Sequence, residues 1–224
     1  MKESFLITIL DWHVLKKLDG FLIKRYVINR SKKLNKSFPV DINRKICEFE
    51  NMFAPDIWIR ISYIKDGFTS LLNGKAVNPN GILLTPEWAA RLLLYNDDDT
   101  INAFLVTVGH EMTHNEGDFS TKGFHGKHKK FINWVNEVHA DFGAAQSMVN
   151  SNRNKLLASM EYKIKSKPHS KDSYTHPSWR HRKKYVEIGA FNKTLIETIA
   201  TDTGCTNEKL IYKVAEYYQD IILR

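Results

Sequence analysis

Residues 110–114 read His-Glu-Met-Thr-His, and this stretch says more about the fold and the chemistry than any other part of the chain. On a helix, positions i and i+4 lie on one face about one turn apart, so His110 and His114 can bind the same metal ion. Glu111 follows the first histidine and can act as a general base on a water molecule at that metal. Because the same five residues also occur by chance on ordinary amphipathic helices, the interpretation depends on the flanking sequence.

The flanking sequence predicts a helix over residues 100–116. The acidic run at residues 97–99, together with Thr100, offers an N-cap and negative charge at the positive end of the helix dipole. Gly117 can end the helix. Apolar residues recur at helical spacing and predict a buried stripe beside the histidines: Ile101, Phe104, Leu105, Val108 and Met112.

A zinc peptidase needs a third protein ligand, and its position distinguishes the classes of these enzymes. Metzincins use a His six residues after the second ligand, but this chain has Ser120 there. Gluzincins use a Glu on a later helix, usually followed four residues on by an Asp. Glu137 and Asp141 fit this pattern on a helix predicted at about residues 129–149, although such a pair also occurs on solvated helix faces. We expect Glu137 to bind the metal and Asp141 to accept a hydrogen bond from a ligating histidine.

Two further elements carry a resemblance to a known family. Residues 137–141 read Glu-Val-His-Ala-Asp and resemble the E-x-x-A-D signature of the HtpX-like and CAAX-prenyl-protease gluzincins. Residues 175–178 read Thr-His-Pro-Ser and, with Arg182, resemble the T-H-P-x-x-x-x-R element of that family. The resemblance covers about residues 80–185. Members best known for these motifs are embedded in membranes, so the soluble minimal gluzincins are the closer comparison.

The resemblance implies a zincin-like fold, peptidase activity and one zinc ion per chain, bound by His110, His114 and Glu137. It also implies that His176 or Arg182 binds substrate or stabilises the developing oxyanion. A structural metal site is normally closed by four protein ligands, whereas a catalytic site leaves one position open. Glu111, which a structural site does not need, favours an enzyme over a non-catalytic module stapled by a metal.

A competing pattern offers a different third ligand. Residues 124–131 resemble the H-G-x-x-F element of the SprT and WLM proteases, in which a His after H-E-x-x-H completes the site. Here that residue would be His125, and the basic surface of the chain would then bind DNA. Alternatively, His125 and His128 are exposed loop residues. We favour Glu137, because only the gluzincin interpretation also explains Asp141 and the Thr-His-Pro element.

Composition sets the remaining bounds. A chain of 224 residues with 42% hydrophobic residues can bury one good core. The net charge of +8 could attract nucleic acid or anionic lipid, but basic runs are more often solvated faces, so we expect a peptide or protein substrate. Cys47 and Cys205 do not make a disulfide framework. No stretch is long and apolar enough to span a membrane, and we predict a soluble, cytoplasmic protein.

The predicted architecture is α+β and mostly helical, with a small twisted sheet, the helix carrying the H-E-x-x-H motif, and a helix carrying Glu137. Residues 1–50 are expected to form a helical segment packed on the core, with a pro-segment or regulatory piece as the alternative, and residues 51–224 the zincin-like domain. Strands are predicted at residues 57–64 and 81–84, and residues 73–74 as a turn. The second strand could be the edge that pairs with substrate backbone. Later helices are predicted at residues 155–162, 191–201 and 207–223, with a polar loop at 166–173.

Overall fold

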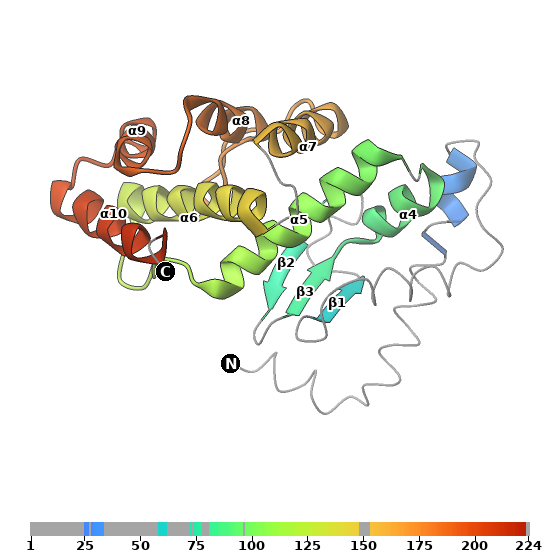
Figure 1. The fold of residues 1–224 in the computed structure, drawn as a ribbon, viewed down its shortest axis with the longest axis horizontal. Helices are drawn as coiled ribbons and strands as arrows, with labels where there is room; N and C mark the ends of the chain where they lie inside the picture. Colours follow the sequence, from blue (N-terminus) through green and yellow to red (C-terminus); the bar gives the residue numbers. More distant parts are fainter. Residues whose placement is uncertain are drawn as a thin grey trace. The chain divides into compact units, whose positions relative to one another are not determined.

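The structure is a computed structural model that describes residues 25, 26, 28–33, 58–61, 72, 74–77, 81–95, 97–147 and 153–222. The chain divides into two compact units, Met1–Ile101 and Asn102–Arg224, with the boundary inside one helix. The described residues are mostly helical and include a small sheet (Figure 1), which confirms the predicted α+β class. None of the helices formed by these residues combines the length and the apolar character needed to cross a membrane.

The first unit contains a three-stranded mixed sheet. Its strands are β1 (Trp58–Ile61), β2 (Gly74–Val77) and β3 (Gly81–Leu84), in the order β1-β3-β2. The β1 strand pairs with β3 in parallel, and β2 pairs with β3 antiparallel. The expectation that residues 81–84 form an edge for substrate is therefore wrong, because both edges of β3 are already paired. Gly74 begins β2 instead of closing a turn, and Asn73 lies outside the described residues.

Helix α4 (Pro86–Leu94) follows β3 directly. Its N-cap is Thr85, and Pro86 occupies the first helical position, where its missing N–H costs nothing. Glu87 is buried and accepts hydrogen bonds from Tyr26 (2.6 Å), Arg30 (3.1 Å) and Arg91 (2.9 Å).

These contacts attach the helical residues described within 25–33 to α4. That stretch agrees with the predicted N-terminal helix. The remainder of residues 1–50, the predicted domain boundary at residue 50 and Cys47 lie outside the described residues.

The second unit is built from helices. They are α5 (Asp98–Glu116), which crosses the unit boundary, α6 (Gly126–Ser147), α7 (Arg153–Ser166), α8 (Trp179–Ile188), α9 (Lys193–Thr203) and α10 (Glu208–Ile222). Five of the six were predicted to within a few residues. The predicted cap of α5 is present, since the Thr100 N–H donates to Asp97 Oδ1 at 2.7 Å. The helix ends before Gly117, whose φ of 143° few other residues adopt.

Helix α8 was not predicted, because its sequence is strongly basic and has little apolar periodicity. It begins at the Ser178 N-cap, whose Oγ accepts a hydrogen bond from the His181 N–H at 3.3 Å. Its buried stripe consists of Arg182, Tyr185 and Val186. Because the first residue of that stripe is an arginine, the sequence lacks the apolar spacing that predicts a helix. The segment is therefore interpreted as a solvated loop unless the partners of Arg182 are known.

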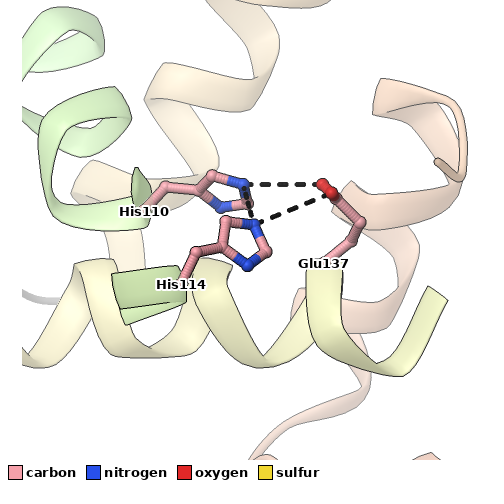
Figure 2. Close-up of side chains that lie close together, drawn as sticks. All are labelled: His110, His114 and Glu137. Carbon is pink, nitrogen blue, oxygen red and sulfur yellow. Dashed lines mark hydrogen bonds and ion pairs between the residues drawn. The ribbon is translucent and has the colours of Figure 1, made fainter. Parts of the chain in front are cut away.

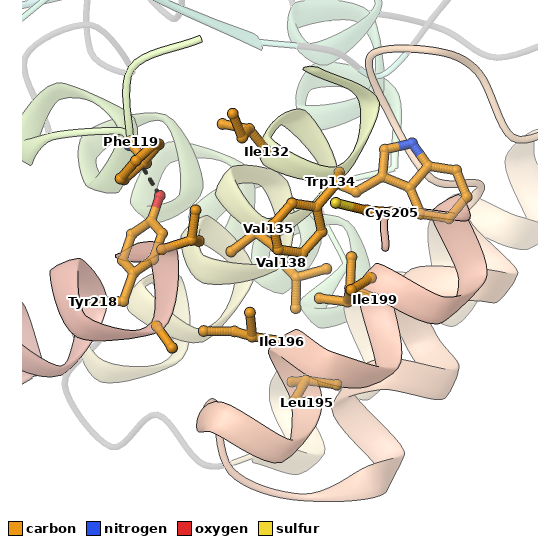
Figure 3. Packing of buried hydrophobic residues seen from close by; sticks show 14 of the residues in the cluster. Phe119, Ile132, Trp134, Val135, Val138, Leu195, Ile196, Ile199, Cys205 and Tyr218 are labelled. Carbon is orange, nitrogen blue, oxygen red and sulfur yellow. Dashed lines mark hydrogen bonds between the residues drawn. The ribbon is translucent and has the colours of Figure 1, made fainter. Parts of the chain in front are cut away.

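One face of α6 forms the centre of the main core of the second unit. Buried residues of α6 pack with residues of α8, α9 and α10, and Figure 3 shows Val135 and Val138 beside Ile199 and Tyr218. The Tyr218 hydroxyl lies within the core and hydrogen-bonds Asn136 Oδ1 (2.6 Å). It also accepts from the Phe119 N–H, at 3.2 Å. The core therefore fixes the rotation of α6 about its axis and the path of the chain between α5 and α6.

A different part of α6 lies against α5. A Cβ atom placed on Gly143 would come within 2.3 Å of Thr113 Oγ1 and 2.5 Å of its Cγ2. Only glycine permits this close approach of the two helices. A second cluster around Val106, Ala144 and Met160 continues the contact toward α7 and α8.

Gly143→Ala is expected to destabilise the protein by about 1–3 kcal/mol, because the added methyl group overpacks the contact with Thr113. A loss of stability would be informative, because alanine forms helix better than glycine by about 1 kcal/mol and would otherwise stabilise the protein. Urea unfolding of metal-free protein measures the change. The double variant Gly143→Ala/Thr113→Ala lacks the Oγ1 and Cγ2 atoms and should recover part of the loss. A Gly143→Ala variant as stable as the parent would show that the helices are not held this closely.

Candidate metal centre

Three side chains from α5 and α6 converge in the second unit. His110 and His114 lie one turn apart on α5, and their Nε2 atoms are 3.1 Å from each other. Glu137 of α6 faces both, with Oε2 at 3.5 Å from His110 Nε2 and Oε1 at 3.7 Å from His114 Nε2 (Figure 2). The potential ligand atoms all lie within 4.8 Å of one another. This largely buried group could hold a metal ion, and in the described part of the chain it is the one such group.

The outer nitrogen of each histidine has a carboxylate partner. His110 Nδ1 lies 3.2 Å from Asp141 Oδ1, the contact expected from the sequence. His114 Nδ1 lies 2.9 Å and 3.0 Å from the two carboxylate oxygens of Asp118. A histidine that donates from Nδ1 keeps the Nε2 lone pair for a metal and has its ring orientation fixed. The sequence analysis missed Asp118, although its spacing of four residues from His114 was a usable signal.

Arg182 of α8 joins the carboxylates of this centre. Its Nε donates to Asp141 Oδ2 at 2.7 Å, and its Nη2 donates to Asp141 Oδ1. Its Nη1 lies 3.2 Å from Glu137 Oε2, and its Nη2 lies 3.1 Å from His110 Nδ1. Because arginine only donates, the form of His110 that binds a metal through Nε2 must direct its Nδ1–H at Asp141 and not accept from Arg182. All three guanidinium nitrogens therefore contact side chains of the centre.

His176 reaches the same centre from the loop before α8. Its Nε2 lies 3.1 Å from Glu137 Oε1, and its side chain is 58% exposed. Its Nδ1 is 2.7 Å from the hydroxyl of Thr175. Pro177, which follows, is buried and restricts the backbone of His176 to extended conformations. The structure thus brings both residues of the Thr-His-Pro and Arg element, His176 and Arg182, to Glu137.

The other two predicted site residues lie in different surroundings. Glu111 is buried on α5, next to the first histidine of the motif. His125 is exposed and lies just before the start of α6, where its carbonyl accepts a hydrogen bond from the Lys129 N–H. Twelve residues separate it from Glu137, which is roughly 18 Å along a helix. His125 is not part of the group formed by His110, His114 and Glu137.

The pKa shifts show a tightly coupled arrangement of charges. Burial raises the pKa of Glu137, but hydrogen bonds from His110 and His176 and the charge of Arg182 outweigh burial and bring it well below its ordinary value. Burial also raises the pKa of Asp141. The charge of Arg182 and the hydrogen bond from His110 outweigh this effect, so the pKa of Asp141 is lowered overall. The pKa of His110 is raised, because hydrogen bonds to Asp141 and Glu137 exceed the lowering effects of burial and Arg182. Both carboxylates are therefore held in the ionised form that a cation requires.

Comparisons with protein-family models, with curated proteins and with solved structures found no match to this chain. The resemblance to gluzincins accordingly rests on the three sequence elements described above. The side-chain geometry is an independent observation, because nothing in the spacing of the elements along the chain requires His176 and Arg182 to meet Glu137.

The lowered pKa values of Asp141 and Glu137 predict acid sensitivity of the metal-free protein. Their stabilising contribution is fully present above their ordinary unfolded pKa values, near 4, and is lost as the pH falls through the lower folded values. His110 does not add to this slope, because below about pH 5 it is protonated in both states. Urea unfolding in the presence of a chelator, at a series of pH values from 7 to 3, measures the dependence.

The matching variant is Asp141→Asn. It should lower the free energy of unfolding at pH 7 by about 3–5 kcal/mol, because Arg182 loses the carboxylate that compensates its buried charge. It should also flatten the loss of stability below pH 5. The control is Glu197→Gln, an exposed surface pair with Lys193, which should change neither quantity noticeably. If Asp141→Asn lost stability below pH 5 as steeply as the parent, Asp141 would not be a source of the acid sensitivity.

Proposed function

We propose that the protein is a zinc-dependent metalloendopeptidase of the gluzincin type. The observation that carries the proposal is the convergence of His110, His114 and Glu137, from two helices, beside the buried Glu111. The proposed substrate is a peptide or protein. The alternative with His125 as third ligand has no geometric support, since that residue is exposed, lies just before the first residue of α6 and is not part of the group formed by His110, His114 and Glu137.

The distances support zinc as the ion. Zinc binds histidine nitrogen at about 2.0–2.1 Å, so two ligands of a tetrahedral site lie roughly 3.3 Å apart. The separations among the two Nε2 atoms and the Glu137 oxygens are 3.1, 3.5 and 3.7 Å. Two nitrogens and one carboxylate form a set that is typical of catalytic zinc and leaves a fourth position for water or substrate. The two Glu137 distances belong to different carboxylate oxygens, and one ligand atom from each of the three residues lies within 4.8 Å of the others, a spacing that supports zinc as the proposed ion.

The proposed reaction is hydrolysis of a peptide bond. Zinc, when bound, would polarise the scissile carbonyl and make a water molecule more acidic. Glu111 accepts the proton of the attacking water and delivers it to the leaving amine. His110 and His114 are oriented for this chemistry by Asp141 and Asp118, which hold their outer nitrogens.

His176 and Arg182 have different proposed tasks. Arg182 is buried and surrounded by the carboxylates of the centre, so its role is to hold Glu137 and Asp141 in place. His176 is more than half exposed and can donate a hydrogen bond to the oxyanion that develops on the substrate. A donor of this kind acts mainly in the transition state, so its removal lowers the catalytic rate more than substrate affinity.

The metal-binding prediction compares alanine substitutions of Glu137 and His125, the two candidates for the third ligand. Purified protein should contain about one zinc ion per chain, and Glu137→Ala should weaken zinc binding by more than about 100-fold, since even a lost partner outside the ligands costs 10–100-fold. His125→Ala should bind zinc as the parent does. Competition with a chromophoric chelator measures both affinities. Loss of zinc in His125→Ala, with Glu137→Ala unaffected, would replace the gluzincin assignment by the SprT-like one.

The catalytic prediction concerns Glu111. Glu111→Gln should retain zinc and fold but lose turnover of peptide substrates about 10³-fold, because the amide cannot accept a proton from water. A library of quenched fluorescent peptides provides the assay, with zinc content and melting temperature measured on the same preparation. Activity within tenfold of the parent would exclude Glu111 as the base. A parent without any peptidase activity would instead indicate a module in which the metal is structural.

A further inference from the structure

The loop that carries His176 is attached to α6 by hydrogen bonds to its backbone. The indole Nε1 of Trp134 donates to the Ser173 carbonyl at 3.0 Å. Asn133 Nδ2 donates to the Tyr174 carbonyl at 3.4 Å. Within the loop, the Ser173 N–H donates to the His176 carbonyl at 2.8 Å, and Ser173 Oγ accepts from the His176 N–H at 2.8 Å. The backbone of an exposed loop is therefore closed into a tight turn just before it reaches Glu137.

A second set of contacts holds the same loop from the other side. His181, in the first turn of α8, lies between two carboxylates: its Nδ1 is 3.1 Å from Asp172 Oδ2 and its Nε2 is 3.2 Å from Asp202 Oδ2. The other oxygen of Asp172 accepts from the Ser178 N–H at 2.7 Å, which closes the loop onto the start of α8. Asp202 belongs to α9 and also accepts from the Tyr185 hydroxyl at 2.8 Å. We call Asp172, His181 and Asp202 the carboxylate–histidine clamp.

The clamp also rests on the aromatic residues that hold the loop. The ring of His181 stacks on Tyr185, with centroids 4.9 Å apart, and meets the ring of Trp134 edge-on at 5.3 Å. Trp134 is the residue whose indole binds the Ser173 carbonyl. The clamp thus joins the loop, α6, α8 and α9 around one imidazole. None of its members forms a hydrogen bond or ion pair with His110, His114 or Glu137, so it acts on the centre indirectly, through the loop that carries His176 or through α8, which carries Arg182.

We infer that the carboxylate–histidine clamp is a positioning device that holds His176 beside Glu137 for the reaction proposed above. The catalytic consequence of this inference rests on the proposed function. The position of His176 is a structural property and does not depend on that function. An exposed histidine on a polar loop would otherwise sample several rotamers and backbone conformations, each at a cost to rate when one geometry is required. The clamp fixes both ends of the segment 172–178, so that the ring of His176 can face the centre.

The first test is a double-mutant cycle. His181→Phe keeps a ring for the contacts with Tyr185 and Trp134 but removes both nitrogens that bind the carboxylates. It should lower kcat about 10-fold with little change in KM or zinc content, whereas His176→Ala should lower kcat about 100-fold. In the His176→Ala background, His181→Phe should have no further effect, because the residue through which it acts is absent. The control is His169→Phe, an exposed histidine of the same loop, which should leave kcat unchanged.

An equal loss of kcat from His181→Phe with and without His176 would overturn the inference and leave the clamp a purely structural contact. If His181→Phe does not fold, Asp172→Asn tests the same point, since it keeps an acceptor for the Ser178 N–H but weakens the contact with His181. Rescue of kcat by a charged Asp172→Glu variant would support positioning, and equal losses in both variants of residue 172 would oppose it.

A second readout does not require activity and separates failure of this inference from failure of the proposed function. Co²⁺ bound in place of zinc produces large, position-dependent shifts of nearby protons in NMR spectra. The His176 ring protons should show one set of such shifts in the parent and smaller or broadened shifts in His181→Phe. The shifts of Val138 on α6 should be the same in the parent and in His181→Phe. Unchanged His176 shifts in His181→Phe would refute the clamp even if the protein were an active peptidase. A protein without activity that shows the loss of shifts would retain the clamp and lose the proposed function.

Discussion

The buried guanidinium of Arg182 is the interaction on which the arrangement of the second unit depends most directly. It binds Asp141 and Glu137 of α6 and approaches His110 of α5, so one side chain of α8 connects three helices. Isolated carboxylates at these buried positions would take up protons, because burial raises their pKa values. The hydrogen bonds from His110 and His176 at Glu137, together with the charge of Arg182 at both carboxylates, lower the two pKa values instead, and burial becomes compatible with negative charge. The planar donor fork of arginine suits this task, and a lysine could not bind Asp141 through two nitrogens while also reaching Glu137.

Packing around Arg182 then determines where the ligating atoms lie. The main core holds α6 against α9 and α10, and the absence of a side chain at Gly143 brings α5 close to α6. Because the two histidines are fixed on α5 and Glu137 on α6, the distance between these helices sets the distances among the ligand atoms. A metal site assembled from rigid helices tolerates little error in that distance. Close contact of the α5 and α6 backbones therefore fixes the positions of the ligand atoms. Arg182 helps the buried carboxylates of the centre to stay ionised.

Much of this arrangement could be predicted from the sequence, for reasons that differ from element to element. Helices α5 and α6 carry local signals: a cap at Asp97, a terminating Gly117 and regular apolar spacing. The pairing of His110 with His114 followed, because i and i+4 positions on a helix share a face in any fold, whereas Glu137 was predicted from its place in the gluzincin pattern. Strand β2 was missed because the four residues Gly-Lys-Ala-Val have weak strand propensity and depend on pairing with β3. The position of β3 in the centre of the sheet was missed for the same reason, since pairing is a property of neighbours and not of the strand itself.

Helix α8 and the carboxylate–histidine clamp were beyond prediction for a related reason. Their defining residues, among them Arg182 and His181, are polar, and a polar residue is recognised as internal only when its partner is known. The partners lie 41 and 21 residues away in sequence, on α6 and α9. Patterns of hydrophobicity carry no record of such pairs. The Thr-His-Pro and Arg resemblance pointed to two of the residues involved, but it gave neither their contacts with Glu137 nor the tasks that those contacts suit.

The balance of charge at the centre connects its structure with the chemistry proposed for it. Glu111, Glu137 and Asp141 face two cationic side chains, Arg182 and Lys163, and all five interact electrostatically. Burial and the neighbouring Arg182 lower the pKa of Lys163 to about 7, so this amine is close to losing its proton at neutral pH. Asp118 at His114 adds a further carboxylate, so carboxylates outnumber the cationic side chains at the centre, and this excess of negative charge suits a divalent cation. A bound divalent ion would offset the excess. The negative charge that develops on a tetrahedral intermediate in the proposed hydrolysis would then meet less repulsion from these carboxylates.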